Sequence, residues 1–258
     1  MKTQRRSRML DKMRSGKPVL SFKLNTSCHR PVEIAAYAGY DAVWLCREHT
    51  PCDWSRLEAQ ILAANAHDVD SIIRVSKGSY SDYIVPLEAN ATGIMVPHLM
   101  SLAEAKSIVR QTRFHPVGLR PWDGGNADGM YCRLTDSEYF ELANHNRMVI
   151  VQIEDKEALD ELDEICALDG IDIIFFGPGD FSQSIGHPGD FAHPEIHRVR
   201  RLIAETARKH GKFAGTVSGP GTLKEYLDMG YMYLNCGADV HALNGYCDNI
   251  TAAFAALQ

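Results

Sequence analysis

The sequence predicts an α/β fold in which eight parallel strands close into a (β/α)8 barrel. Short apolar runs alternate with helical patterns along all 258 residues, and regular β-then-α alternation implies parallel strands joined by right-handed crossovers. Eight strands in about 250 residues is the usual size of this barrel. We therefore expect a single domain over residues 1–258. Residues 1–16 are expected to form an amphipathic N-terminal helix, because Met9, Leu10 and Met13 interrupt a basic stretch at helical spacing.

The expected strands are apolar runs bounded by glycine, proline or polar turn residues. In chain order they are Val19–Leu24, Ala42–Leu45, Ser71–Val75, Thr92–Val96, Met148–Ile153, Asp172–Phe176, Phe213–Val217 and Tyr231–Asn235. The segments between them show helical patterns over Pro31–Ala38, Trp54–Ala66, Ser101–Gln111, Glu157–Leu168, Pro194–His210 and Gly221–Met229. Several of these helices run into a glycine placed as a C-terminal cap, as at Gly39 and Gly230.

A ninth apolar run, Val117–Leu119, is bracketed by Pro116 and Pro121, and we expect it to begin a long loop. A doubly wound open sheet is the main alternative to the barrel. However, no expected strand is followed by a G-x-G-x-x-G turn. The glycines of Gly215–Gly221 have another spacing, and Pro220 interrupts them. The barrel is therefore the better prediction.

Composition limits the classes of function. The net charge of −6 and the pI of about 6.0 argue against a nucleic-acid or membrane-surface binder. No apolar run approaches the ~20 residues of a membrane span. The seven cysteines are odd in number, scattered and without a C-x-x-C pair, which favours a reduced, cytoplasmic setting. We expect a cytoplasmic protein with small-molecule partners.

Two carboxylates follow two neighbouring strands. Glu154 closes the run Met148–Ile153, and Asp180 follows Asp172–Phe176 across a Gly-Pro-Gly turn. Because parallel strands end at one edge of a sheet, both carboxylates are expected at the C-terminal edge, outside the core. Without an adjacent Lys or Arg they would repel each other unless a cation lay between them, and a hard divalent ion is the simplest answer. The open alternative is that they only cap the following helices.

Other polar residues fall at the same expected edge. Arg74 lies inside an apolar run, where burial without an anion is costly, so it predicts a nearby substrate carboxylate or a structural ion pair. His49 is either a solvated loop residue or a proton-transfer group. His98 could equally pack beside Pro97, and Cys46 is by default a small buried apolar residue.

Several motifs at these positions resemble the metal-dependent class II pyruvate aldolases of the HpcH/HpaI group, in the phosphoenolpyruvate/pyruvate barrel superfamily. The resemblance runs from about Leu20 to the C-terminus. Its most specific pieces are Glu48-His49-x-Pro51-x-Asp53, Ile73-Arg74, Met95-Val96-Pro97, Gly118-Leu119-Arg120, Val151-Gln152-Ile153-Glu154 and Phe176-Gly177-Pro178-Gly179-Asp180-Phe181-Ser182. It implies a carbon–carbon lyase that cleaves or forms a 2-oxo-4-hydroxy acid through a pyruvate-type enolate, with a 2-oxoacid and an aldehyde as partners.

The resemblance also implies a metal centre and a place for the 2-oxoacid. Glu154 and Asp180 would be ligands of Mg²⁺ or Mn²⁺, with Co²⁺ or Zn²⁺ as alternatives. Gln152 would lie in the surroundings of the metal. The N–H groups around Gly179 and Asp180 would hold the substrate carboxylate. Since the family forms oligomers, commonly hexamers, we expect a homo-oligomer, a hexamer or trimer of dimers, with the C-terminal helix packed against a neighbouring subunit.

In the same family pattern, Arg74 would contact the substrate and steady the enolate, and His49 would act in the proton transfers. No Schiff-base lysine is required, and we expect none at the relevant strand ends. The chain departs from the pattern where the second strand usually ends Asp-Gly-Glu-His, because it has Cys46 and Arg47 before Glu48 and His49. A thiol cannot orient an imidazole as a carboxylate does. Two alternatives to the aldolase therefore stay open: a related metal-enolate lyase, hydratase or decarboxylase, and a catalytically silent 2-oxoacid-binding protein.

Overall fold

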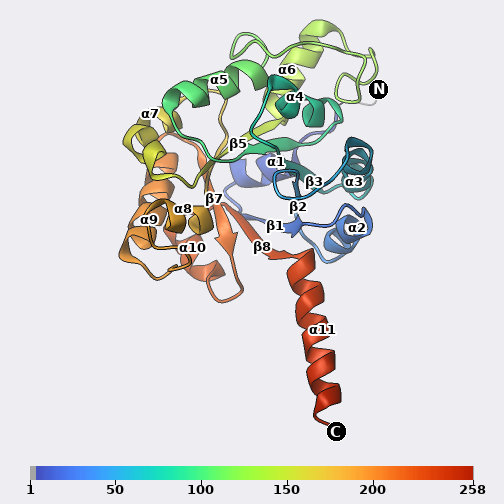
Figure 1. Cartoon of the computed structure of the whole chain (residues 1–258). Helices are drawn as coiled ribbons and strands as arrows, with labels where there is room; N and C mark the ends of the chain where they lie inside the picture. The colour runs from blue at the N-terminus through green and yellow to red at the C-terminus, as the bar shows by residue number, and fades with distance from the viewer. Residues whose placement is uncertain (1–3, 258) are drawn as a thin grey trace.

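The computed structural model describes residues 4–257 and has the predicted closed barrel (Figure 1). Eight parallel strands pair in chain order, and the first pairs with the last. They are β1 (Val19–Leu24), β2 (Ala42–Cys46), β3 (Asp70–Arg74), β4 (Gly93–Val96), β5 (Met148–Ile153), β6 (Ile173–Phe176), β7 (Phe213–Ser218) and β8 (Tyr233–Ala238). The predicted strands are therefore confirmed. Only the ends differ, most of all in β8, which begins and finishes later than expected.

The helices surround the strands (Figure 1). They are α1 (Arg8–Arg14), α2 (Arg30–Tyr37), α3 (Trp54–Ala66), α4 (Tyr80–Glu88), α5 (Leu102–Thr112), α6 (Asp136–Asn146), α7 (Leu162–Ala167), α8 (Pro178–Ser184), α9 (Pro194–Lys209), α10 (Leu223–Met229) and α11 (Asp239–Ala255), with a 3₁₀ helix η1 (Lys156–Glu161) before α7. The single helix expected over Glu157–Leu168 is thus η1 followed by the short α7. No strand forms over Val117–Leu119, as predicted.

The barrel interior is filled by one apolar cluster and closed at its N-terminal end by α1. Met9, Leu10 and Met13 of α1 join interior residues such as Trp44 and Phe175 in this cluster. The predicted amphipathic helix is therefore α1, shorter than the expected range, of which residues 1–3 lie outside the described part. Because α1 closes this end, we expect the active site at the opposite, C-terminal end of the strands, as in other barrels of this type.

A buried carboxylate fixes α1 to the barrel. Asp70, the first residue of β3, is fully buried. It accepts hydrogen bonds from the Ser7 hydroxyl at 2.6 Å and the Met9 backbone N–H at 2.9 Å. Arg5 Nη1 lies 2.8 Å from the same carboxylate and supplies the opposite charge. Paired in this way, the charge is tolerated in the interior.

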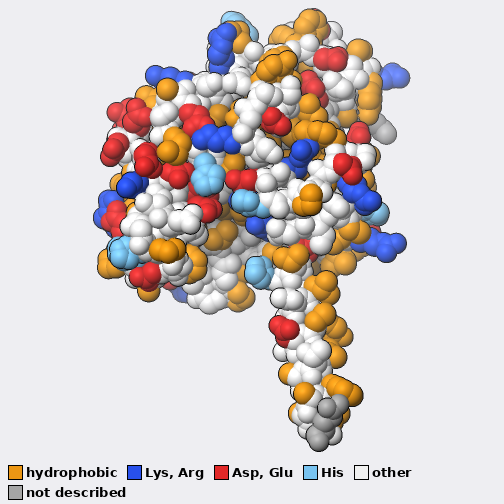
Figure 2. All heavy atoms as spheres, viewed as in Figure 1, with side chains coloured by type: hydrophobic (Ala, Val, Ile, Leu, Met, Phe, Trp, Pro, Cys, Tyr) orange, Lys and Arg blue, Asp and Glu red, His pale blue; other side chains and the backbone are white. Residues whose placement is uncertain are grey.

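The last helix, α11, extends away from the barrel (Figure 1), and none of its residues is buried. It carries large apolar side chains that recur every three or four residues and therefore gather on one side, as Figure 2 shows along its length. They are Val240, Leu243, Tyr246, Ile250 and Phe254. Among residues 4–257, α11 and the other helices are all too short or too polar to cross a membrane.

Candidate active site

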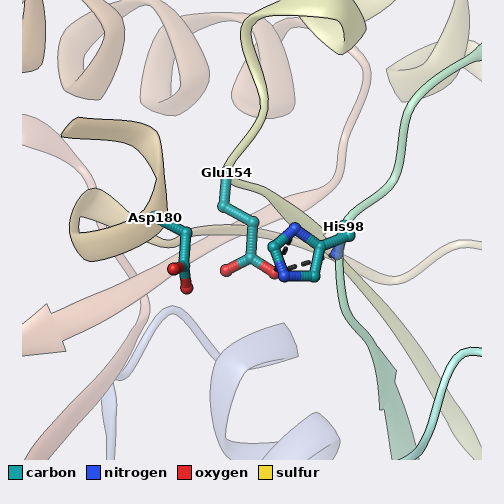
Figure 3. Close-up of side chains that lie close together, drawn as sticks. All are labelled: His98, Glu154 and Asp180. Atoms are coloured by element: carbon teal, nitrogen blue, oxygen red, sulfur yellow. Dashed lines mark hydrogen bonds and ion pairs between the residues drawn. The ribbon is translucent and has the colours of Figure 1, made fainter. Parts of the chain in front are cut away.

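Three side chains from neighbouring strand ends meet at the C-terminal edge of the barrel (Figure 3). Glu154 follows β5, Asp180 lies in the first turn of α8 after β6, and His98 lies two residues beyond β4. One donor atom of each residue lies within 4.8 Å of the others. The structure thus brings Glu154 and Asp180 together as expected. It adds His98, which the sequence left as an equal choice between packing and chemistry.

Local structure holds the Glu154 carboxylate in one place. The backbone N–H of His98 donates to Glu154 Oε1 at 2.8 Å, and the Gln152 side-chain amide donates to Oε2 at 3.0 Å. A Cβ at Gly177 would lie 2.3 Å from Oε2, so only glycine leaves room for the carboxylate. His98 has a φ of +50°, a left-handed conformation that costs non-glycine residues about 1–3 kcal/mol and persists where the surroundings impose it.

Nearby positive charge, from His98 and Arg74, compensates the buried carboxylate pair only in part. Glu154 is only 1% exposed, which corrects the expectation that it would lie outside the core. Burial raises its pKa from the ordinary 4.5 to about 7, and the neighbouring charge of Asp180 also raises it, against the opposing effect of His98. A divalent cation would relieve both effects. Two carboxylates and an imidazole form a donor set that suits Mn²⁺, Co²⁺ or Zn²⁺, and the two carboxylates alone suit Mg²⁺.

His98 is oriented by acidic neighbours. Its Nδ1 lies 2.9 Å from Asp155 Oδ2, and its Nε2 lies 3.6 Å from Glu48 Oε1. Burial lowers the pKa of His98, but the hydrogen bond to Asp155 and the nearby carboxylates outweigh it, so its pKa is raised overall. A carboxylate bound to one ring nitrogen is the usual means of fixing an imidazole for work at the other.

Arg74 ends β3 inside the mouth of the barrel and is 5% exposed. Its Nε lies 3.0 Å from Glu48 Oε2, and its Nη2 donates to Cys46 Sγ at 3.1 Å. Burial raises the pKa of the Cys46 thiol, but the Arg74 charge and a hydrogen bond from the His49 backbone N–H outweigh it, so the pKa is lowered overall. The structural ion pair that the sequence allowed for Arg74 is therefore present, with Glu48.

His49 lies at the rim of the same cluster. Its side chain is 58% exposed, and Nε2 lies 3.3 Å from Glu48 Oε2. The backbone N–H of His49 donates to Cys46 Sγ, but among the described residues the His49 ring makes no hydrogen bond to this thiol. The Arg47 guanidinium stacks on the Trp54 ring at 3.8 Å, and its side chain is therefore directed toward the start of α3.

Two further expected residues, Gln152 and Gly179, lie beside the metal-binding cluster in sequence, and Arg120 has another partner. Gln152 is buried beside Glu154, and its Oε1 finds no hydrogen-bond partner among the described residues. Gly179 is exposed in the first turn of α8, where N–H groups lack helical partners. Arg120, part of a resembling motif, lies in the long connection after α5, where its Nη2 is 2.9 Å from Asp128 Oδ2.

A lysine that the sequence analysis excluded lies at the mouth. Lys23 is one residue before the end of β1, and its Nζ lies 4.9 Å from the centre of the Trp44 ring. The expectation of no lysine at the relevant strand ends is therefore wrong. The sequence does contain evidence for this lysine, because Val19, Ser21 and Lys23 alternate along β1 and so share its inner face.

The comparisons with known proteins agree with this geometry. A family described as HpcH/HpaI aldolase/citrate lyase matches residues 22–244. A hydroxypyruvate/pyruvate aldolase of Pseudomonas aeruginosa is 32% identical, over 92% of this chain and 88% of its own. A 2-keto-3-deoxy-L-rhamnonate aldolase of Escherichia coli is 30% identical, over 95% and 91%. The crystal structure of citrate synthase SbnG is 27% identical with a TM-score of 0.87, over 96% of both chains.

Proposed function

The chain belongs to the HpcH/HpaI aldolase/citrate lyase family and is a metal-dependent, class II aldolase-type carbon–carbon lyase. On this basis we propose that it cleaves or forms a 2-oxo-4-hydroxy acid, with pyruvate or a close 2-oxoacid as one partner. The observation that carries this proposal is the meeting of Glu154, Asp180 and His98 beside a buried Arg74. Hydroxypyruvate is a second 2-oxoacid to test, because it is named for one relative.

Glu154 and Asp180 would hold the metal ion, with His98 as a third donor. When bound, a divalent ion acts as a Lewis acid that polarises the keto oxygen of the 2-oxoacid and offsets the charge of the enolate. We take Mn²⁺ or Mg²⁺ as the metal. Gln152 keeps Glu154 in position through its 3.0 Å hydrogen bond. The N–H groups of Gly179 and Asp180 would receive the carboxylate of the 2-oxoacid.

The cleavage needs one base and one acid. A base removes the proton of the 4-hydroxyl, the oxygen's electron pair forms the aldehyde carbonyl, and the C3–C4 bond breaks. The electron pair of that bond leaves as the enolate of the 2-oxoacid, and C3 then takes a proton to give the methyl group. His49 is the residue we assign to these proton transfers, with Glu48 3.3 Å from its Nε2. Arg74 would steady the enolate through its guanidinium.

The exposed apolar side of α11 supports a homo-oligomer. Within residues 4–257, no apolar surface covers five large side chains of α11: Val240, Leu243, Tyr246, Ile250 and Phe254. We propose that α11 packs against a neighbouring subunit in a hexamer built as a trimer of dimers. Seven free cysteines, several of them exposed, favour the reducing cytoplasm.

Solvent-deuterium exchange into the methyl group of pyruvate tests the function without knowledge of the aldehyde. Protein loaded with Mn²⁺ or Mg²⁺ should exchange these protons, and the Asp180→Asn variant should not. The matched control is Asp160→Asn, an exposed aspartate of η1 away from the cluster. If pyruvate binds to the metal-loaded protein but no exchange occurs with any divalent metal, the chain is a silent 2-oxoacid-binding protein.

A further inference from the structure

The mouth of the barrel holds a pair of cations that lies apart from the metal cluster. The Arg74 guanidinium and the Lys23 ammonium are each 4.9 Å from the centre of the Trp44 ring. Lys23 pairs in register with Trp44 on β2, and Arg74 pairs with Cys46 one layer higher. Both positive groups therefore contact one indole, on the β1–β3 side of the mouth, and the charge of Arg74 acts on Lys23.

Lys23 has no anion of its own. Among residues 4–257 it forms no ion pair, whereas Arg74 is paired with Glu48 at 3.0 Å. Asp239, the other carboxylate that influences Lys23, accepts hydrogen bonds from the backbone N–H groups of Asn25 and Thr26. Burial lowers the pKa of Lys23, and the charge of Arg74 lowers it further. Two partly desolvated cations that repel each other are unfavourable until an anion joins them.

Cys46 adds to this shortage of negative charge beside Lys23 and Arg74. It stands where the resembling family has an aspartate, which would bring a permanent negative charge to the pair. Here the thiol is engaged by Arg74 Nη2 at 3.1 Å and faces no donor from Lys23 among the described residues. The positive charge of Lys23 is therefore left for a ligand.

The position of Lys23 indicates which ligand. The metal cluster is built by the ends of β4, β5 and β6, and β1 lies across the closed barrel from β5. A molecule whose 2-oxoacid end lies at the metal cluster would extend its other end past Arg74 toward Lys23. An anionic group at that far end would meet the unpaired ammonium.

We propose that Lys23 binds a second carboxylate, carried by the aldehyde partner, so that the substrate is a dicarboxylic 2-oxo-4-hydroxy acid. This inference rests on the proposed aldolase function. A carboxylate there forms a charge-assisted hydrogen bond with the Lys23 ammonium and offsets the repulsion from Arg74. A neutral aldehyde of the same length does neither.

The test compares two aldehydes that share a two-carbon skeleton: glyoxylate, which has a carboxylate, and glycolaldehyde, which has a hydroxymethyl group. The readout is the ratio of kcat/KM for their addition to pyruvate, measured in the parent, Lys23→Met and Lys23→Arg. Methionine keeps the length of the side chain without its charge, and arginine keeps the charge. Lys17→Met is the matched control, because Lys17 is an exposed lysine just before β1 at the closed end of the barrel.

The parent should prefer glyoxylate. Lys23→Met should lower that preference by about tenfold or more, the effect of one lost charged hydrogen bond. Lys23→Arg should keep most of the preference, and Lys17→Met should keep it in full. An unchanged ratio in Lys23→Met, or a parent that exchanges pyruvate protons but does not add glyoxylate, would overturn the inference. Failure of the parent to exchange pyruvate protons at all would instead overturn the proposed function.

Discussion

Replacing Glu154 by glutamine should make the metal-free protein more stable, although it removes a proposed ligand. Glu154 is 1% exposed, and burial raises its pKa from 4.5 to about 7. At 1.36 kcal/mol per pKa unit, this rise corresponds to a cost of about 3 kcal/mol when the carboxylate is ionised in the folded state. Because the folded pKa is the higher one, the cost is absent well below pH 4.5, grows between the two values and is complete above about pH 7.

The glutamine side chain should keep most of the local contacts. Its carbonyl oxygen can accept from the His98 backbone N–H, as Glu154 Oε1 does at 2.8 Å. Its NH₂ group would face the Gln152 amide, which now donates to Oε2. Since Gln152 Oε1 is buried and free of partners among the described residues, rotation of that amide would restore a hydrogen bond. We therefore expect a net gain of about 2 kcal/mol at pH 8, after about 1 kcal/mol for imperfect hydrogen bonds.

Urea unfolding in the presence of EDTA measures this difference. Glu154→Gln should unfold at higher urea than the parent at pH 8, and the gap should shrink to less than about 1 kcal/mol at pH 5, where the folded protein holds a proton on Glu154. Glu157→Gln, at an exposed position in η1, is the control and should change little. With saturating Mn²⁺ only the parent should gain stability. No gain at pH 8, or the same gain at both pH values, would refute the reasoning.

Three further predictions concern the mouth and the last helix. Arg74→Lys keeps the charge but loses the fork that meets Glu48 and Cys46, so pyruvate exchange should fall by about tenfold or more; unchanged exchange would leave Arg74 with a structural role alone. Cys46→Asp, alone or with Arg47→Gly, should raise exchange by about 10²-fold if His49 is a base that lacks its carboxylate, and a rate no faster in either variant while metal and pyruvate still bind would exclude that role. Ending the chain before α11 should yield smaller assemblies by light scattering, and an unchanged mass would show that the helix is dispensable for assembly.

The sequence was sufficient for the barrel because its strands are buried on both faces and read as continuous apolar runs. It was also sufficient to predict that Glu154 and Asp180 lie at one edge of the sheet, since neighbouring parallel strands end at the same edge. It failed for α4, in which Pro86 interrupts the helical pattern, and for α6, whose apolar side is weak. Both helices begin with an N-terminal capping box; α4 also packs on β4, and α6 packs on Phe114 of the long connection after α5.

The site was harder to predict than the fold, for reasons of side-chain direction. The position of His98 depends on a left-handed backbone that no periodicity reveals. Lys23 lies inside β1, one residue before its end, and so does not belong to the residues that follow the strands. The burial of Glu154 depends on Gly177 and on the hydrogen bonds from its neighbours, which are contacts between separate strand ends.

Strand β3 carries opposite buried charges at its two ends, Asp70 held by α1 and Arg74 held by Glu48. These residues and Ile72 share the inner face, so a slip of one residue would turn both charges outward against the helices. A slip of two would bring Asp70 up into the apolar layer of Ile72, away from Arg5 and Ser7. Both errors leave an unpaired charge in the core. The contact of Asp70 with α1 therefore fixes the register of β3, and this register fixes how far the Arg74 guanidinium extends into the mouth of the barrel.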